Sequence, residues 1–295
     1  MNIVVTGSLG HISQPLAIEL LAKGHTVTVV SSKPDKQTAI DELGARAAIG
    51  SLEDVEFLAA TFAGADAVYA MIPPNVTGSD VRAYYGRIGR HYAQAITQAG
   101  VRRVVYLSSY GADLDEGTGL ILGAHDVEGI LGQLSDVAVT YLRPTYFYYN
   151  LYAFVGMIKG TGSMAANYGG TDKLVMVAPV DIAAVAAEEL TTPSHTGRTV
   201  RYIASDERTG TDIARVLGEA IGKPDLTWTV ITDGQMQNGM EANGVPARLA
   251  ADFVAMFASV RSGALSRDYY QNPPATLGRT KLDDFAKEFA AVYKS

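Results

Sequence analysis

Near its beginning the chain reads Ile3-Val4-Val5-Thr6-Gly7-Ser8-Leu9-Gly10-His11-Ile12-Ser13. Its β-branched residues predict a short strand, and a helical pattern begins directly after the turn. Gly7 permits a tight turn, Gly10 lets the backbone approach a phosphate group, and Ser13 is small enough for close packing of helix on strand. Free amides at the start of such a helix attract anions. The stretch therefore predicts a phosphate-binding turn; a plain turn with glycines for geometry alone is the alternative.

A short apolar run followed by an amphipathic stretch recurs through the first 142 residues. This alternation is typical of parallel strands joined by crossover helices, and glycines supply the left-handed caps at the helix ends. The predicted fold class is therefore α/β, a Rossmann-like doubly wound parallel sheet. The predicted strands are 3–5, 26–30, 45–49, 67–71, 104–107 and 137–142, and the predicted helices are 11–23, 35–43, 55–62, 81–98 and 124–134.

Composition excludes several classes of protein. The chain has 295 residues, 47% hydrophobic and 19% charged, which is typical of a globular protein rather than a disordered or fibrous one. It has no cysteine, which excludes disulfides and thiolate chemistry. The 24 basic and 31 acidic residues give a net charge of −7, which disfavours direct contact with nucleic acid or anionic lipid. Neither a signal peptide nor a membrane-spanning run is recognisable, so a cytoplasmic protein is expected.

The end of the second predicted strand indicates which dinucleotide such a fold binds. A site selective for NAD places an acidic residue there, about 20 residues past the glycines. Here the position reads Val30-Ser31-Ser32-Lys33. Hydroxyl groups and a lysine accept a 2′-phosphate better than a ribose hydroxyl, so NADP (as NADPH) is the predicted cofactor and NAD stays open. Lys33 and Lys36 also fit a solvated helix start.

Loops after the other strands are expected to complete this site, because parallel strands end at one edge of the sheet. The histidines show no second ligand pair at metal spacing, so no metal is predicted. The predicted cofactor-binding residues are Gly7, Ser8, Leu9, Gly10, His11, Ile12, Ser31, Ser32, Lys33, Ser51, Leu52, Met71, Ile72, Pro73, Ser108, Ser109 and Pro144.

The regular alternation decays after residue 142 into a stretch rich in glycine and aromatic residues. Residues 1–150 are predicted to form the dinucleotide-binding core, and residues 151–295 a smaller, mostly helical subdomain that covers the substrate. A helix and a strand within 180–204 are expected to return to the core. Further helices are expected at 211–222, 245–261 and 281–293, and an extended segment at 227–231.

Several segments together resemble one family. They are Thr6 to Ile12, the turn Gly50-Ser51-Leu52-Glu53-Asp54, residues 104–109, Leu142-Arg143-Pro144 followed by aromatics and Asn150, and Val180-Asp181-Ile182-Ala183. The chain thereby resembles the NmrA-like group of atypical short-chain dehydrogenases over most of its length. That group includes NADPH-dependent quinone reductases and regulators that sense NADP without turnover. The resemblance therefore implies a dinucleotide site and leaves open whether there is turnover.

Dehydrogenase relatives usually carry a tyrosine and a lysine four residues later as a proton relay. None of the 16 tyrosines here has a lysine at that spacing, and residues 104–158 contain no lysine. Ordinary ketone reduction needs this proton relay, which the chain lacks. Hydride transfer to an electron-poor quinone needs mainly the correct positioning of cofactor and acceptor. An NADPH-dependent oxidoreductase acting on a quinone or similar conjugated carbonyl is therefore predicted. A non-catalytic redox sensor and a biosynthetic enzyme for polycyclic aromatic substrates are the alternatives.

Two residues are predicted to be catalytic, Tyr110 and His125. Tyr110 follows the fifth strand, where its hydroxyl reaches a substrate carbonyl or packs in the core. His125 and Glu128 lie on one helix face, and a similar pair in NmrA-like quinone reductases implies contact with the nicotinamide ribose or the substrate; an exposed helical ion pair is the alternative. The predicted wall of the pocket, suited to a planar aromatic substrate, is Tyr146, Phe147, Tyr149 and Asn150. A homodimer or a regulatory protein partner stays open.

Overall fold

The computed structural model describes residues 1–75, 80–192 and 197–295, which group into two compact units. The first unit consists of Met1–Ala112, Gly123–Arg143 and Ile182–Arg201. The second consists of Asp113–Leu122, Pro144–Asp181 and Tyr202–Ser295. This grouping differs from the predicted boundary at residue 150, because residues 113–122 and 144–150 belong to the second unit. His195, one of the five histidines considered as metal ligands, lies outside the described residues.

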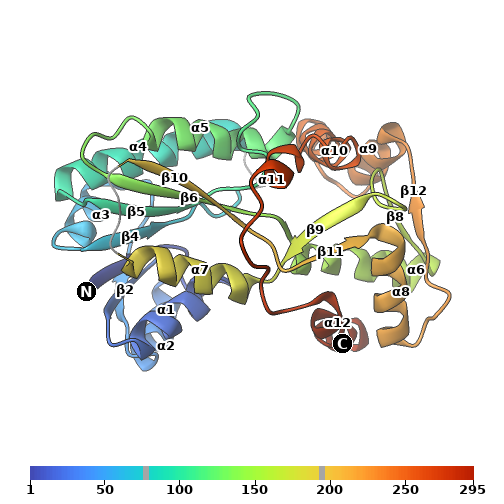
Figure 1. Cartoon of the computed structure of the whole chain (residues 1–295), viewed down its shortest axis with the longest axis horizontal. Helices are drawn as coiled ribbons and strands as arrows, with labels where there is room; N and C mark the ends of the chain where they lie inside the picture. Colours follow the sequence, from blue (N-terminus) through green and yellow to red (C-terminus); the bar gives the residue numbers. More distant parts are fainter. Residues whose placement is uncertain (76–79, 193–196) are drawn as a thin grey trace. The chain divides into compact units, whose positions relative to one another are not determined.

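A seven-stranded sheet forms the centre of the first unit (Figure 1). Its order is β10-β6-β5-β4-β1-β2-β3, and β1 pairs in parallel with both β2 and β4. The order reverses at β1, which makes the carboxyl ends of β1 and β4 the place where such sheets bind ligands. The doubly wound parallel sheet is thus confirmed. The strands are β1 (Asn2–Val5), β2 (Thr26–Ser31), β3 (Arg46–Ile49), β4 (Ala67–Ala70), β5 (Arg103–Leu107), β6 (Ala138–Pro144) and β10 (Arg198–Ile203).

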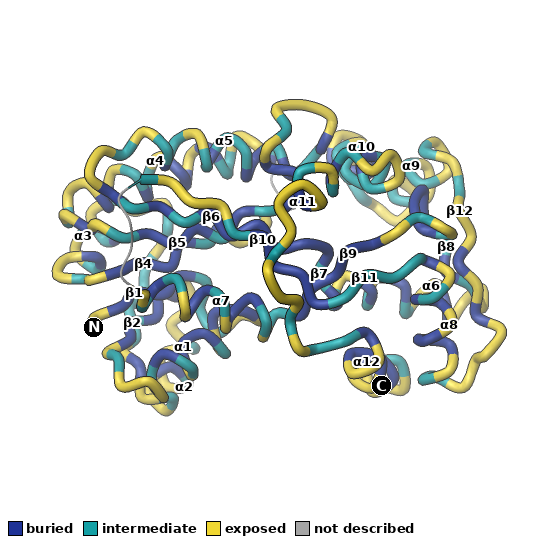
Figure 2. Tube along the Cα trace, in the orientation of Figure 1, coloured by how far each residue is buried: buried dark blue, intermediate teal, exposed yellow. Residues whose placement is uncertain are grey.

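Helices cover both faces of this sheet, with α3, α4 and α5 on one face and α1, α2 and α7 on the other (Figure 1). Because both faces are covered, the central strands are apolar throughout, and every residue of β4 is buried (Figure 2). Leu58, Ile88 and Val127 pack from α3, α4 and α5 into one cluster with the strands. The helices are α1 (Ser13–Ala22), η1 (Pro34–Lys36), α2 (Gln37–Glu42), α3 (Val55–Phe62), α4 (Val81–Ala99), α5 (Leu122–Leu131) and α7 (Pro179–Thr191).

Local capping residues fix where these helices begin and end. The Asp54 and Asp80 carboxylates accept the amides of Phe57 and Ala83, at 3.0 Å and 2.9 Å, and start α3 and α4. Gly100, with φ +67°, ends α4 in the left-handed conformation. These signals explain why the predicted helices 55–62 and 81–98 match the structure to within one residue.

The second unit combines helices with two small sheets, β11-β9-β7 and β12-β8 (Figure 1). Of these five strands, only β12 had been predicted, as the extended segment 227–231. The unit is mostly helical, as expected, but most of its strands were not predicted, because strands of two to five residues give too short a pattern to recognise. The strands are β7 (Tyr146–Phe147), β8 (Met164–Ala166), β9 (Lys173–Val177), β11 (Asp206–Thr209) and β12 (Trp228–Val230). The helices are η2 (Gly119–Ile121), η3 (Tyr148–Phe154), α6 (Val155–Thr161), α8 (Gly210–Ile221), α9 (Asp233–Ala242), α10 (Ala247–Arg261), α11 (Arg267–Gln271) and α12 (Leu282–Lys294).

The core of the second unit is largely aromatic. Phe285 of α12 stacks on Tyr148, with ring centroids 5.3 Å apart, and Phe289 stacks on Tyr152 at 6.0 Å. Such rings bury large apolar areas, so α12 is a structural part of this unit. Of the helices in the described ranges, none has the length and apolarity needed to cross a membrane.

Candidate dinucleotide site

The turn between β1 and α1 leaves no room for a side chain at Gly7. This residue has φ +98°, and a Cβ atom there would lie 2.5 Å from Ser13 Oγ and 2.8 Å from Met71 Cγ. Ser13 Oγ donates a hydrogen bond to the Thr6 carbonyl at 2.8 Å. The close approach of helix to strand therefore requires small residues at positions 7 and 13, as the fingerprint of this fold does.

Backbone amides at the turn are available to a ligand. Within the described chain, the amides of Leu9 and Ile12 make no bond to a backbone carbonyl, whereas the Gly10 amide donates to Gly7 O at 3.2 Å. Helix α1 begins at Ser13 and has no acidic residue in its first turn. A helix start with free amides and no competing carboxylate carries partial positive charge and suits phosphate oxygens.

Ser8 and Ser31 join the turn to the end of β2. Ser8 has φ +56°, its amide donates to Val30 O at 2.9 Å, and its hydroxyl donates to Ser31 Oγ at 2.9 Å. Ser31 Oγ also accepts the Lys33 amide at 3.2 Å and is buried. Ser31 was predicted to contact the cofactor, but its hydroxyl is occupied in holding the two loops together. Ser32 and Lys33 are exposed and leave polar groups available at this strand end.

Tyr92 of α4 supports the turn, which the sequence analysis missed. Its hydroxyl donates to Met71 O at 2.7 Å and lies 3.1 Å from Thr6 Oγ1, which accepts the Met71 amide at 2.9 Å. Burial raises the pKa of Tyr92, so the hydroxyl stays protonated and keeps donating. Nothing in the sequence distinguishes Tyr92 from an ordinary core residue of an amphipathic helix.

Helix α4 also holds the turn after β3, which carries Ser51 and Leu52. His91 Nδ1 lies 3.2 Å from Leu52 O, and because a carbonyl only accepts, this nitrogen carries the proton. Arg87 donates to both carboxylate oxygens of Glu53, at 3.0 Å and 3.1 Å. Those hydrogen bonds lower the pKa of Glu53. The turn that carries the predicted cofactor residues Ser51 and Leu52 is thus held in place, with the Glu53 carboxylate paired to an arginine.

The end of β4 divides its predicted residues between the core and the surface. Met71 is half-buried against Gly7, and Ile72 is buried in the cluster between the sheet and α3 to α5. Pro73 is exposed. Of these three predicted residues, Met71 and Pro73 are therefore the ones accessible to a ligand.

The loop after β5 is held by α5 at both ends. Ser108 Oγ donates to Glu128 Oε1 at 2.5 Å, and His125 Nδ1 lies 2.9 Å from Ala112 O. Tyr110 is buried, and Ser109, whose hydroxyl donates to Tyr110 O at 3.0 Å, is half-buried. The alternative of an exposed ion pair between His125 and Glu128 is wrong, because Glu128 pairs with the buried Arg143.

The predicted substrate residues all lie in the second unit, together with Pro144. Tyr146, predicted to lie at a pocket wall, is a core residue, and its hydroxyl is 3.0 Å from that of Tyr168. Phe147 and Tyr149 are half-buried, with ring centroids 5.1 Å apart, and Asn150 is exposed.

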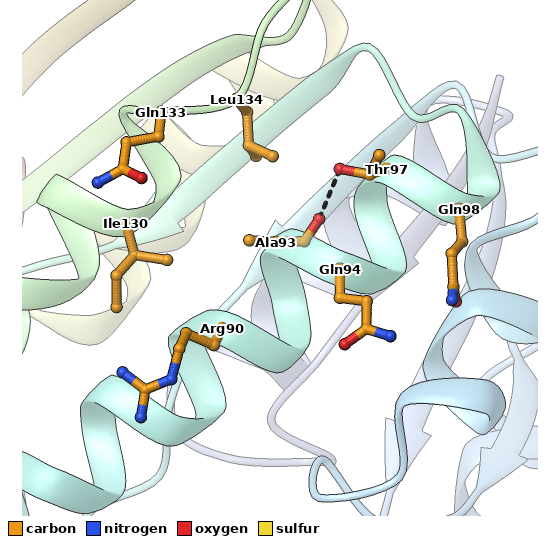
Figure 3. Close-up of a pocket in the computed structure, with 8 residues that line it drawn as sticks. All are labelled: Arg90, Ala93, Gln94, Thr97, Gln98, Ile130, Gln133 and Leu134. Atoms are coloured by element: carbon orange, nitrogen blue, oxygen red, sulfur yellow. Dashed lines mark hydrogen bonds between the residues drawn. The ribbon is translucent and has the colours of Figure 1, made fainter.

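A pocket between α4 and α5 lies elsewhere in the first unit (Figure 3). Its lining comes from the carboxyl-terminal half of α4, from the end of α5 and from the turn just after α5, and these segments lead into the amino ends of β5 and β6. It is therefore at the opposite edge of the sheet from the phosphate-binding turn. The lining residues are Arg90, Ala93, Gln94, Thr97, Gln98, Ile130, Gln133 and Leu134.

The residues at the carboxyl edge fit a dinucleotide, because a turn that admits no side chain at Gly7, free amides, and exposed Ser32 and Lys33 follow adjacent strands. Among residues 1–75, 80–192 and 197–295, there is no cluster of three or more histidine or acidic side chains placed to hold a metal. The model of the NmrA-like family matches residues 1–266. The chain belongs to the NmrA-like family.

Known proteins similar to this NmrA-like chain include an NAD(P)H azoreductase of Xenophilus azovorans. The two are 27% identical over 262 residues, which cover 88% of this chain and 87% of the relative. Two solved structures show the same fold. An NADPH-dependent quinone oxidoreductase from Escherichia coli has a TM-score of 0.78 at 22% identity, covering 97% of this chain and 98% of the other. The triphenylmethane reductase of Citrobacter sp. complexed with NADP(H) has a TM-score of 0.78 at 21% identity, covering 98% and 99%.

Proposed function

We propose that this NmrA-like protein is an NADPH-dependent reductase that transfers hydride to a quinone or a similar conjugated acceptor. The observation that carries the proposal is the turn at Gly7 and Gly10, where free amides meet a position that admits no side chain. The names of the similar proteins support it, because azo compounds, quinones and triphenylmethane dyes are all conjugated acceptors.

The proposed cofactor contacts follow the carboxyl ends of the strands. Gly7 to Ile12 would hold the diphosphate through backbone amides, and Ser32 with Lys33 would hold the 2′-phosphate. Ser51 and Leu52 would line the adenine side, and Met71, Pro73 and Ser109 the nicotinamide side. When bound, NADPH supplies a hydride.

Tyr110 and His125 are the proposed catalytic residues. Hydride addition to a quinone leaves an oxygen anion that must gain one proton to give the hydroquinone. Because His125 Nδ1 donates to Ala112 O, Nε2 would be the ring nitrogen that relays this proton from solvent to the oxygen. The Tyr110 hydroxyl would donate a hydrogen bond to the same oxygen. Phe147, Tyr149 and Asn150 stay the proposed substrate contacts.

The test measures NADPH consumption with benzoquinone. We expect quinone-dependent loss of NADPH absorbance, at a rate that His125→Ala or Tyr110→Phe lowers about tenfold. We also expect the preference for NADPH over NADH to fall about tenfold in Lys33→Ala, because one lost charge contact is worth about 1.4 kcal/mol. Lys23→Ala is the matched control, since Lys23 is an exposed lysine of the same unit that pairs with Glu19 of α1. An unchanged cofactor preference in Lys33→Ala would contradict the assignment of the 2′-phosphate.

The same assay separates enzyme from sensor. A redox sensor must bind NADPH and NADP with different affinity, since a ligand shifts a conformational balance only through differential affinity. Absent turnover with unequal affinities would favour the sensor. Absent turnover with no affinity for either form would contradict both functions.

A further inference from the structure

A buried charge cluster lies where β5, β6 and α5 meet in the first unit. Arg143 of β6 donates to Glu128 of α5 from Nη2 at 2.7 Å and from Nε at 3.0 Å. Their side chains are only 8% and 10% exposed. Ser108, directly after β5, donates its hydroxyl to the same carboxylate at 2.5 Å. Tyr141 OH donates to the backbone carbonyl of Glu128 at 2.9 Å, which fixes the helix turn as well as the side chain.

Such a pair is not explained by stability alone. Removing two charges from water costs about as much as their attraction returns, so an apolar pair of similar volume often leaves a fold equally stable. What an apolar pair cannot do is accept the hydrogen bond from Ser108. The position of Ser108 relative to α5 is therefore a feature that depends on the charges.

The loop 108–112 that begins at Ser108 is anchored again at its other end. His125, three residues before Glu128 on α5, holds Ala112 O at 2.9 Å. Between the anchors lie Ser109, the buried Tyr110 and Gly111, whose φ is +79°. A loop of this length, fixed at both ends and turning through a left-handed glycine, has little freedom to adjust.

We propose that Glu128 and Arg143 are positioning residues that set the loop 108–112, and through it the Tyr110 hydroxyl, for hydride transfer. The inference rests on the proposed function and assigns neither residue a contact with substrate or cofactor. A side chain misplaced by about 1 Å costs up to about a hundredfold in rate, so loss of the anchor is expected to lower kcat. The loop holds only one of the proposed NADPH contacts, Ser109, and the turn at Gly7 has its own supports, so binding of NADPH is expected to change little.

The test replaces the pair with an apolar one, Glu128→Leu with Arg143→Met. We expect kcat for benzoquinone reduction to fall about tenfold, with a Kd for NADPH within about twofold of wild type and the unfolding midpoint largely retained. Amide hydrogen exchange in 109–112 is expected to become faster. Ser108→Ala removes only one hydrogen bond, and it should lower kcat and speed exchange in the same loop without changing the ion pair.

The matched control is Arg82→Ala with Asp126→Ala. Like Glu128, Asp126 lies on α5 and pairs with an arginine through two hydrogen bonds, here from Arg82 of α4 at 2.6 Å and 2.8 Å, but the two side chains are 48% and 29% exposed. The control is expected to keep kcat and loop exchange at wild-type values.

Three outcomes are informative. Wild-type kcat and wild-type exchange in the apolar double variant would overturn the inference, as would a loss of kcat explained wholly by a smaller folded fraction. A wild-type protein without quinone-dependent turnover would overturn the proposed function instead, and exchange in 109–112 would still decide whether Glu128 and Arg143 set the loop.

Discussion

Replacing Gly7 with alanine perturbs the phosphate-binding turn at its most crowded point. The new Cβ would lie 2.5 Å from Ser13 Oγ, 2.8 Å from Met71 Cγ and 2.9 Å from Met71 Sδ, and the residue would keep φ +98°. Ser13 cannot retreat freely, because its hydroxyl is bonded to the Thr6 carbonyl. The substitution therefore adds both backbone strain and overpacking.

The two costs can be estimated separately. A residue with a Cβ atom in the left-handed region costs about 1–2 kcal/mol, and overpacking a close-packed site costs about 1–3 kcal/mol. Gly7→Ala should therefore lower the free energy of unfolding by about 2–5 kcal/mol. Gly24→Ala is the matched control, because Gly24 has φ +80° and an added Cβ would meet nothing within 4 Å. The control should show the strain alone, about 1–2 kcal/mol.

The assay is urea unfolding of both variants, together with titration of NADPH by fluorescence. We expect Gly7→Ala to lose about 1–3 kcal/mol more stability than Gly24→Ala. We also expect its NADPH affinity to fall at least about tenfold, which corresponds to 1.4 kcal/mol, whereas Gly24→Ala keeps wild-type affinity. Equal stability losses, or wild-type NADPH affinity in Gly7→Ala, would refute the role given to this turn.

Three further predictions concern groups that only the structure reveals. Tyr92→Phe keeps the ring and removes the hydroxyl that supports Met71, so it should cost about 0.5–1.5 kcal/mol by urea unfolding and weaken NADPH binding; unchanged NADPH binding would contradict the supporting role. Gly119→Ala places a Cβ 1.9 Å from Asp252 O, so overpacking should destabilise the second unit by about 1–3 kcal/mol in addition to backbone strain. Gly117→Ala is the control, because an added Cβ would meet nothing within 4 Å and should cost only the strain of its φ of +76°. Burial raises the pKa values of Tyr85 and Tyr141 from 10.0 to about 12, so the unfolded chain loses these protons first and the free energy of unfolding should fall as the pH rises from about 10 to about 12. Ultraviolet titration should show tyrosinate appearing together with unfolding. Ionisation of all tyrosines near pH 10 in folded protein would contradict this prediction.

The sheet of the first unit and the place of its phosphate-binding turn could be predicted from the sequence alone. These features depend on local signals: β-branched runs, glycines with positive φ, and capping carboxylates such as Asp54, which act within a few residues of the chain. Gly7 and Ser13 could be assigned from spacing because the turn that joins them is local.

The contacts of each polar side chain near the phosphate-binding turn depend on the tertiary structure. Ser31 and Ser108 were predicted to face the cofactor, yet Ser31 bonds to Ser8 and Ser108 bonds to Glu128, which lie 23 and 20 residues away in the chain. The Tyr92 hydroxyl reaches Thr6 across 86 residues, and Tyr146 is buried against Tyr168. The sequence around a serine or tyrosine is the same whether its hydroxyl binds a ligand or another loop. The hydroxyl's partner depends on packing between distant segments and not on spacing along the chain.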